Sequence, residues 1–232
     1  SKREGAEDVL EYRAAGFLPD AVLNFLALLG WSHPEGKEIL AKEELIGAFS
    51  LDRVGTAAAV FDQTKLRFIN GKHIHAKPPD ERAKVLAEFL KSRGETPPAI
   101  HDLAGMLKVN GERGDTLAEI ADYIRFFWER PAAYDDAAFK KFLAGKDDLV
   151  EKIRREFEAL ADFAGESSEI FFRDFSERHN LKFKDVGQAI RVMLTGKSVS
   201  PPIFQSAELL GRAETLLRID HAQEALRAGG RA

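Results

Sequence analysis

Apolar residues recur along almost the whole chain with the spacing of one face of an α-helix. Between residues 18 and 29 they fall at three- and four-residue steps, which places their side chains on one side of a helix. Pro19 suits the first turn of this helix and Gly30 suits its end. The same period predicts helices at about 80–94, 116–128, 147–164, 166–179, 184–195 and 203–211. No strand-like alternation competes, so we predict an all-α fold.

One stretch, LRFINGKHIHA at 66–76, allows two interpretations. It is either a β-hairpin around Asn70-Gly71 or a helix that Asp62 caps and that ends at the same pair. We favour the helix. Two other caps are predicted, a capping box formed by Thr116 and Glu119 and an N-cap at Ser200 for a helix whose first turn contains Pro201.

Composition limits the kind of protein. Of 232 residues, 44% are hydrophobic and 31% are charged, which is typical of a globular chain. The longest apolar stretch, at 21–31, is much shorter than the roughly 20 residues that span a bilayer, so no membrane association is predicted. The absence of cysteine excludes disulfides and thiol catalysis and is compatible with a cytoplasmic protein.

The sequence lacks the usual signatures of a self-contained active site. The glycine pair at 111–114 has no following Lys-Ser/Thr of a phosphate loop, and no nucleophile elbow is present. His73 and His75 have no third ligand nearby, so we predict two exposed imidazoles and no metal site. We therefore predict no catalytic residue in this chain.

One polar stripe suggests binding instead. Residues 181–205 hold four basic side chains against one acid, although the net charge of the chain is −4. On the helix predicted there, one face carries Lys184, Gln188, Arg191 and Thr195. This face suits a phosphate or a base edge, and the alternative is an ordinary solvated surface.

Several stretches in the same order resemble bacterial glutamyl-tRNA synthetase. The stretches are EYRAAGFLPDAVLNFLALLGWS (11–32), VFDQTKLRFINGKHI (60–74), ERGDTLAEI (112–120), AIRVMLTGKSVSPPIF (189–204) and LLGRAETLLRI (209–219). Together they extend over essentially the whole chain and correspond to the C-terminal half of the family's enzyme. The resemblance implies a stem-contact domain at 1–76 and two anticodon-binding subdomains at 77–130 and 131–232, all helical.

The resemblance also implies what the chain does. The family's full-length enzyme, a class I synthetase, uses ATP and Mg to join glutamate to its tRNA. Ser1-Lys2-Arg3 match the end of the family's ATP loop, so we expect SKREG to be a cut end, with the catalytic domain upstream. The chain alone is then an inactive, monomeric, cytoplasmic tRNA-binding part that needs no cofactor of its own and has tRNA and the catalytic domain as partners.

Seven residues receive roles from this resemblance. Lys2 would contact ATP in the intact enzyme, and Lys65 and Phe68 would contact the tRNA stem. Arg113 would read the third anticodon base, which separates glutamate from glutamine anticodons. Arg191, Ser200 and Ile203 would also lie at the anticodon, with Pro202 in place of a usual glycine. Whether the parent enzyme discriminates between the two tRNAs stays open, and the alternative function is a standalone helical module that binds RNA or protein.

Overall fold

The structure is a computed structural model that describes residues 9–55 and 60–228. Within these residues all regular structure is helical, and the one β-type pairing is an isolated bridge between Trp31 and Val54. The chain forms two compact units, an N-terminal unit of residues 1–107 and 112–122 and a C-terminal unit of 108–111 and 123–232. The all-α prediction is confirmed, whereas the three-part division predicted from the sequence stays a prediction.

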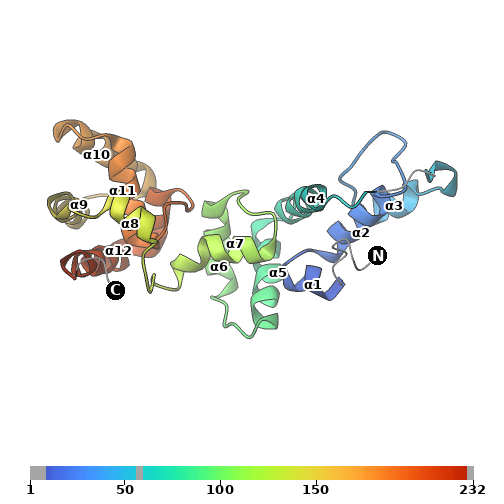
Figure 1. Ribbon diagram of the computed structural model, residues 1–232, viewed down its shortest axis with the longest axis horizontal. Coiled ribbons are helices and arrows are strands. Elements are labelled where there is room, and N and C mark those ends of the chain that lie inside the picture. Colours follow the sequence, from blue (N-terminus) through green and yellow to red (C-terminus); the bar gives the residue numbers. More distant parts are fainter. Residues whose placement is uncertain (1–8, 56–59, 229–232) are drawn as a thin grey trace. The chain divides into compact units, whose positions relative to one another are not determined.

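Helices α1 to α5 belong to the N-terminal unit, and the boundary between the units crosses the last turns of α6 and α7 (Figure 1). Their bounds are α1 Val9–Ala14, α2 Pro19–Leu28, α3 Lys42–Ala48, η1 Leu51–Arg53, α4 Gln63–His75, α5 Pro79–Ser92, α6 Ile100–Asn110 and α7 Leu117–Ile124. Helix α2 packs on α4. As predicted, Pro19 occupies the first turn of α2, and α5 ends just before Gly94.

The hydrogen bonds of Asn70 explain why α4 continues beyond Asn70-Gly71. Asp62 caps α4 as predicted, but the predicted end at this pair is wrong because the helix runs to His75. Asn70 is fully buried, accepts a hydrogen bond from the Leu18 N–H at 2.8 Å and donates to the Asp115 carbonyl at 2.5 Å. A Cβ on Gly71 would lie 2.5 Å from Asp115 Oδ1, so glycine here allows close packing inside the helix rather than a turn.

The C-terminal unit is a helical bundle, and Figure 1 shows α8 to α12 gathered around one core. Its elements are η2 Arg125–Phe127, α8 Asp136–Phe142, α9 Asp147–Ala159, α10 Gly165–Arg178, α11 Phe183–Thr195 and α12 Ile203–Arg227. Helix α12 packs against α9, α10 and α11, and α8 packs on α11. Large side chains fill the core, among them Phe157, Phe172, Phe175, Ile190 and Met193, which are fully buried.

The helix predicted at 203–211 is the first part of a longer element. Helix α12 extends to Arg227, but Gly211 has φ 78° and ψ 160°, which is not helical backbone. The segment therefore consists of two helical runs that meet at Gly211, and the predicted end coincides with this break. A positive φ of this size is readily adopted only by glycine.

Replacing Asn70 by alanine should destabilise the fold. The substitution leaves the Leu18 N–H and the Asp115 carbonyl without their partner, and unsatisfied buried polar groups cost about 1–3 kcal/mol. Urea unfolding of Asn70→Ala should give a free energy of unfolding lower by about that amount. Gln63→Ala, an exposed site on the same helix, should change it by less than about 0.5 kcal/mol. Equal effects of the two substitutions would contradict this role of Asn70.

Candidate nucleic-acid interface

The outer face of α4 carries two of the residues assigned to the tRNA stem. Lys65 and Phe68 are three positions apart, and Phe68 is 50% exposed. Lys72 lies one turn further, and its Nζ is 5.7 Å from the centre of the Phe68 ring. Lys72 was not among the residues predicted to bind, although its spacing of seven from Lys65 places both on the same side of a helix.

Both lysines of this face pair with acidic side chains. Lys65 Nζ lies 2.6 Å from Glu38 Oε1, and Lys72 Nζ lies 4.0 Å from Glu112 Oε2. Each pair is substantially exposed, so it contributes little to stability and a phosphate competes with the carboxylate at small cost. The α4 face, defined by Lys65, Phe68 and Lys72, combines cationic and aromatic groups that suit a nucleic-acid backbone and a base or sugar.

Arg113 lies on a loop between α6 and α7 that is fixed on its C-terminal side. Gly114 has φ 88°, and a Cβ there would lie 2.9 Å from Ile120 Cγ1. The Gly114 carbonyl is 2.9 Å from His75 Nε2, and the next carbonyl, of Asp115, accepts from Asn70. The Arg113 side chain itself is exposed. The loop therefore holds an accessible guanidinium on an anchored backbone.

The capping box predicted for α7 is only half formed. Thr116 Oγ1 accepts from the Glu119 N–H at 3.2 Å, but the Glu119 carboxylate accepts from Asp115 N–H at 2.9 Å rather than from Thr116. Arg67 of α4 also donates to Glu119. Burial alone would raise the pKa of Glu119, but these hydrogen bonds outweigh it and the pKa lies below its ordinary value. Glu119 therefore links α4 to the loop of Arg113.

The two histidines of α4 are not the exposed imidazoles that the sequence predicted. His73 Nε2 lies 2.9 Å from Asn24 Oδ1, and His75 contacts the Gly114 carbonyl. Burial lowers the pKa of His73. Both rings are half-buried because α4 packs its flank against α2 and the Arg113 loop. Among the described residues no three His, Cys, Asp or Glu side chains form a group suited to a metal ion.

In the C-terminal unit, Arg191 and Ser200 are brought together. Arg191 Nη1 donates to the Ser200 carbonyl at 3.0 Å, to Ser200 Oγ at 2.5 Å and to the Pro201 carbonyl at 3.0 Å. The predicted N-cap at Ser200 is wrong, because its hydroxyl donates to the Pro201 carbonyl and α12 begins at Ile203 after Pro202. The turn before α12 is therefore held by Arg191, and Ser200 does not cap the helix as predicted.

Burial along this loop is uneven. Ser200 is 6% exposed and Ile203 is 4% exposed, and Thr195, predicted on the polar face, is 5% exposed. Thr195 is buried because its hydroxyl donates to the Arg191 carbonyl and accepts from the Lys197 N–H. Pro202, next to α12, is exposed, and so are three consecutive residues, Lys197, Ser198 and Val199. We call residues 196–202 the α11–α12 loop, and its tip is these three residues.

A buried ion pair lies on α12 of the same unit. Arg218, which is 2% exposed, donates through Nε to Glu214 Oε1 at 2.8 Å. Arg130 also donates to both oxygens of Glu214. Hydrogen bonds from Arg130 and then from Arg218 lower the pKa of Glu214 from 4.5 to about 2, against the opposing effect of burial. Glu214 is thus ionised at neutral pH and neutralises charge that would otherwise be buried alone.

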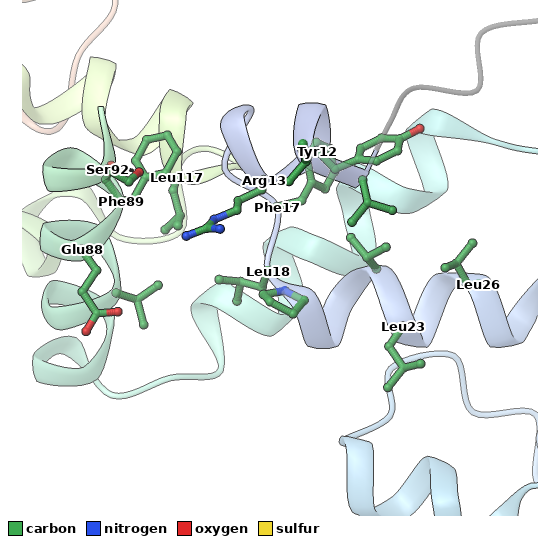
Figure 2. A pocket seen from close by; sticks show the side chains of 15 residues that line it. Tyr12, Arg13, Phe17, Leu18, Leu23, Leu26, Glu88, Phe89, Ser92 and Leu117 are labelled. Atoms are coloured by element: carbon green, nitrogen blue, oxygen red, sulfur yellow. Dashed lines mark hydrogen bonds between the residues drawn. The ribbon is translucent and has the colours of Figure 1, made fainter. Parts of the chain in front are cut away.

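A cavity of about 560 Å³ lies in the N-terminal unit, with walls from α1, α2, α5 and the start of α7. Figure 2 shows that most of its lining is apolar, with Arg13 and Glu88 as the charged side chains. Val9 and Leu10 are both about two-thirds exposed there. Such a lining suits another apolar surface, and it offers no convergent set of polar groups for a small substrate.

The described residues thus form a helical domain in which Arg113 and Arg191 lie on or beside anchored loops. Residues 73–223 match the family described as anticodon binding domain, and this chain belongs to that family. Residues 1–68 match the catalytic domain of class I tRNA synthetases of the E and Q type. Lys2 lies in the matched range but outside the described residues.

Proteins similar to this chain in sequence include bacterial glutamate–tRNA ligases. The glutamate–tRNA ligase of Geotalea uraniireducens is 40% identical over 230 residues, which are 99% of this chain and 49% of that protein. That of Geobacter sulfurreducens is 38% identical over 96% of this chain and 48% of its own length. A crystal structure of a glutamate tRNA ligase from Elizabethkingia meningosepticum superposes with a TM-score of 0.84 at 25% identity, over 97% of this chain and 48% of that one. The chain thus spans about half the length of these relatives, and the predicted family resemblance is confirmed.

No helix among the described residues is both long and apolar enough to cross a membrane.

The pKa of Glu214 makes a testable prediction for stability. Because its pKa in the folded chain, about 2, lies below the ordinary value of 4.5, ionised Glu214 stabilises the fold above about pH 4.5. This contribution is lost as the pH falls toward 2. In urea unfolding, Glu214→Gln should be less stable than the unsubstituted chain at pH 7, and the difference should shrink steadily between pH 4.5 and 2. A difference that does not depend on pH would contradict the assignment.

Proposed function

We propose that this chain is the tRNA-binding, C-terminal part of a glutamate–tRNA ligase. It recognises the glutamate tRNA for ATP-dependent glutamylation by a catalytic domain of the kind that the longer relatives possess. Support comes from the family of residues 73–223 and from the ligase names of relatives that resemble the chain over nearly its full length.

The anchored position of Arg113 is the observation that carries this proposal. An arginine on a fixed backbone avoids the loss of backbone freedom on binding, and its planar fork recognises a base edge with two hydrogen bonds. The loop of Arg113 is held by His75, Asn70 and Glu119, while its side chain stays accessible. Arg113 is therefore the proposed reader of the third anticodon base.

The α4 face is the proposed contact for the tRNA stem. Lys65 and Lys72 would each exchange a carboxylate for a phosphate, and Phe68 supplies an exposed ring between them. Such contacts fix the position of the RNA and carry no sequence information by themselves.

The α11–α12 loop is the proposed second contact with the anticodon. Arg191 and Ser200 shape it from within and Ile203 lies buried at its end, so the surface offered to unstacked bases comes mainly from the tip. In this proposal the three-part division at 1–76, 77–130 and 131–232 separates the stem contact from the two anticodon contacts.

ATP and Mg act in the catalytic domain of the full-length enzyme, where Lys2 would stabilise phosphate charge. The described residues hold no group suited to a metal, and the chain alone is expected not to glutamylate tRNA. The proposed setting is the cytoplasm, and the proposed state is a monomer.

Arg113→Gln should abolish the preference for the correct third anticodon base. We expect the unsubstituted chain to prefer a glutamate-tRNA transcript over one with the glutamine base at this position by about 5-fold to 150-fold, which corresponds to about 1–3 kcal/mol. Fluorescence titration at low salt measures both dissociation constants. Arg93→Gln, an exposed arginine of the same unit that pairs with Glu95, should keep the preference. Equal binding of both transcripts by the unsubstituted chain would instead favour a helical module without anticodon reading.

Lys65→Ala should weaken binding of both transcripts by the same factor. Loss of one phosphate contact should reduce the slope of log K against log salt by about 1. Titrations between 50 and 200 mM salt, about the range over which such slopes are resolved, provide this measurement. Lys37→Ala is the matched control, because Lys37 is a lysine of the same unit that is also paired, with Glu35 and Glu44. An unchanged slope in Lys65→Ala would remove the α4 face from the interface.

A further inference from the structure

The segment LLGRAETLLRI at 209–219 resembles the synthetase family, but no role is assigned to its polar residues. Two of them, Glu214 and Arg218, form the buried pair of α12. Arg218 makes a second contact that reaches outside its own helix, since Nη1 donates to the Leu194 carbonyl at 2.7 Å. Leu194 is in the last turn of α11, directly before the α11–α12 loop.

Glu214 extends this link to the segment that precedes α8. Arg130 donates to Glu214 through Nε at 2.8 Å and through Nη2 at 2.7 Å. The residue after Arg130, Pro131, lies under the start of the loop, because a Cβ on Gly196 would be 2.8 Å from Pro131 Cβ. The Gly196 carbonyl also accepts from the Asp135 N–H at 2.8 Å. The Glu214 carboxylate thus links Arg218, which holds the end of α11, to Arg130, which directly precedes Pro131.

The α11–α12 loop is therefore fixed at both ends by arginines on neighbouring helices. Arg218 holds the carbonyl of Leu194 on one side, and Arg191 holds the carbonyls of Ser200 and Pro201 on the other. Between these points only the tip, Lys197 to Val199, is exposed. A loop held in this way presents its tip with little conformational freedom.

We propose that Glu214 and Arg218 are positioning residues for RNA recognition by the α11–α12 loop. Glu214 fixes the guanidinium of Arg218, and Arg218 fixes the end of α11 from which Arg191 and the loop project. The inference rests on the proposed anticodon binding of this loop, but it assigns a role to residues that do not themselves touch RNA.

A second ion pair on α12 provides a matched control. Asp220 accepts from Arg154 Nε at 2.5 Å, and this pair joins α12 to α9. Arg154 also donates to Glu158 of its own helix, α9. A role limited to stability predicts that each substitution weakens recognition only as far as it lowers the fraction of folded chain. A positioning role predicts that breaking the Glu214 pair, and not the Asp220 pair, weakens recognition by the folded chain.

The test uses the whole chain with Glu214→Gln, Arg218→Lys, Arg130→Gln, Asp220→Asn and Arg191→Gln. Lysine keeps the charge of Arg218 but cannot reproduce the fork that serves Glu214 and Leu194 together. Arg130 is largely exposed, so Arg130→Gln should fold even if a buried substitution does not. The probes are fluorescein-labelled RNA stem-loops with the glutamate anticodon and three others, each with one anticodon base changed. Circular dichroism selects a temperature at which every variant is folded.

Arg191→Gln identifies the anticodon base that the loop reads, since discrimination at that base should fall from about 5-fold or more to below about 2-fold. Glu214→Gln and Arg218→Lys should lose discrimination at the same base and Arg130→Gln should lose part of it. Asp220→Asn should stay within about 2-fold of the unsubstituted chain. The salt dependence should be unchanged in all of them, because no phosphate contact is removed.

Two results would overturn the inference while leaving the proposed function intact. One is full discrimination in folded Glu214→Gln and Arg218→Lys, and the other is an equal loss in Asp220→Asn, which would indicate a general effect of stability. If the unsubstituted chain discriminates at none of the three bases, the proposed anticodon reading fails first and the positioning role fails with it.

Discussion

Carbonyls of loops and helix ends that accept hydrogen bonds from helix side chains are the constraint on which both proposed RNA-binding loops depend. A carbonyl removed from water must find a donor, and in a loop the backbone does not supply one. Asn70 supplies it to Asp115, Arg191 to Ser200 and Pro201, and Arg218 to Leu194. Arg212 does the same for the carbonyls of residues 157 and 158, in the last turn of α9, and of residue 160, which follows α9. The helices therefore determine the shape of the loops, and the loops carry the residues proposed to bind.

Apolar periodicity is a local signal that predicted most of the longer helices, and the buried stripe of α11 lies where the pattern placed it. Helices α1, α3, α6 and α8 were not predicted. The sequence prediction also failed where a polar residue serves a distant segment. Asn70-Gly71 is typical of a turn, yet its partners Leu18 and Asp115 lie 52 and 45 residues away and favour a helix. Ser200 was expected to act on the helix after it, but Arg191 engages it from the helix before. The hydrogen bond from Arg218 to Leu194 gave no signal in the sequence, since its acceptor is a backbone carbonyl.

Ion pairing explains how a chain of net charge −4 can offer a surface to RNA. The lysines of the α4 face are paired with Glu38 and Glu112, so their charge is compensated until a phosphate replaces the carboxylate. Exposed pairs are weak, and the exchange costs little. Glu214 is different, because one of its two partners, Arg218, is only 2% exposed. The exposed pairs of Lys65 and Lys72 can exchange their carboxylates for phosphates, whereas the pair of Glu214 with Arg218 stabilises the fold.

Contacts within the folded chain also determine when the two recognition loops become ordered. Ordering a loop on binding would reduce affinity by the entropy of each residue that becomes fixed. Here the Arg113 loop and the α11–α12 loop are ordered by contacts within the folded chain, so that entropy is lost on folding instead. The same contacts then serve stability and recognition, and a substitution such as Glu214→Gln is informative only when the two effects are measured separately. Asp220, paired on the same helix but directed toward α9, is the residue that allows this separation.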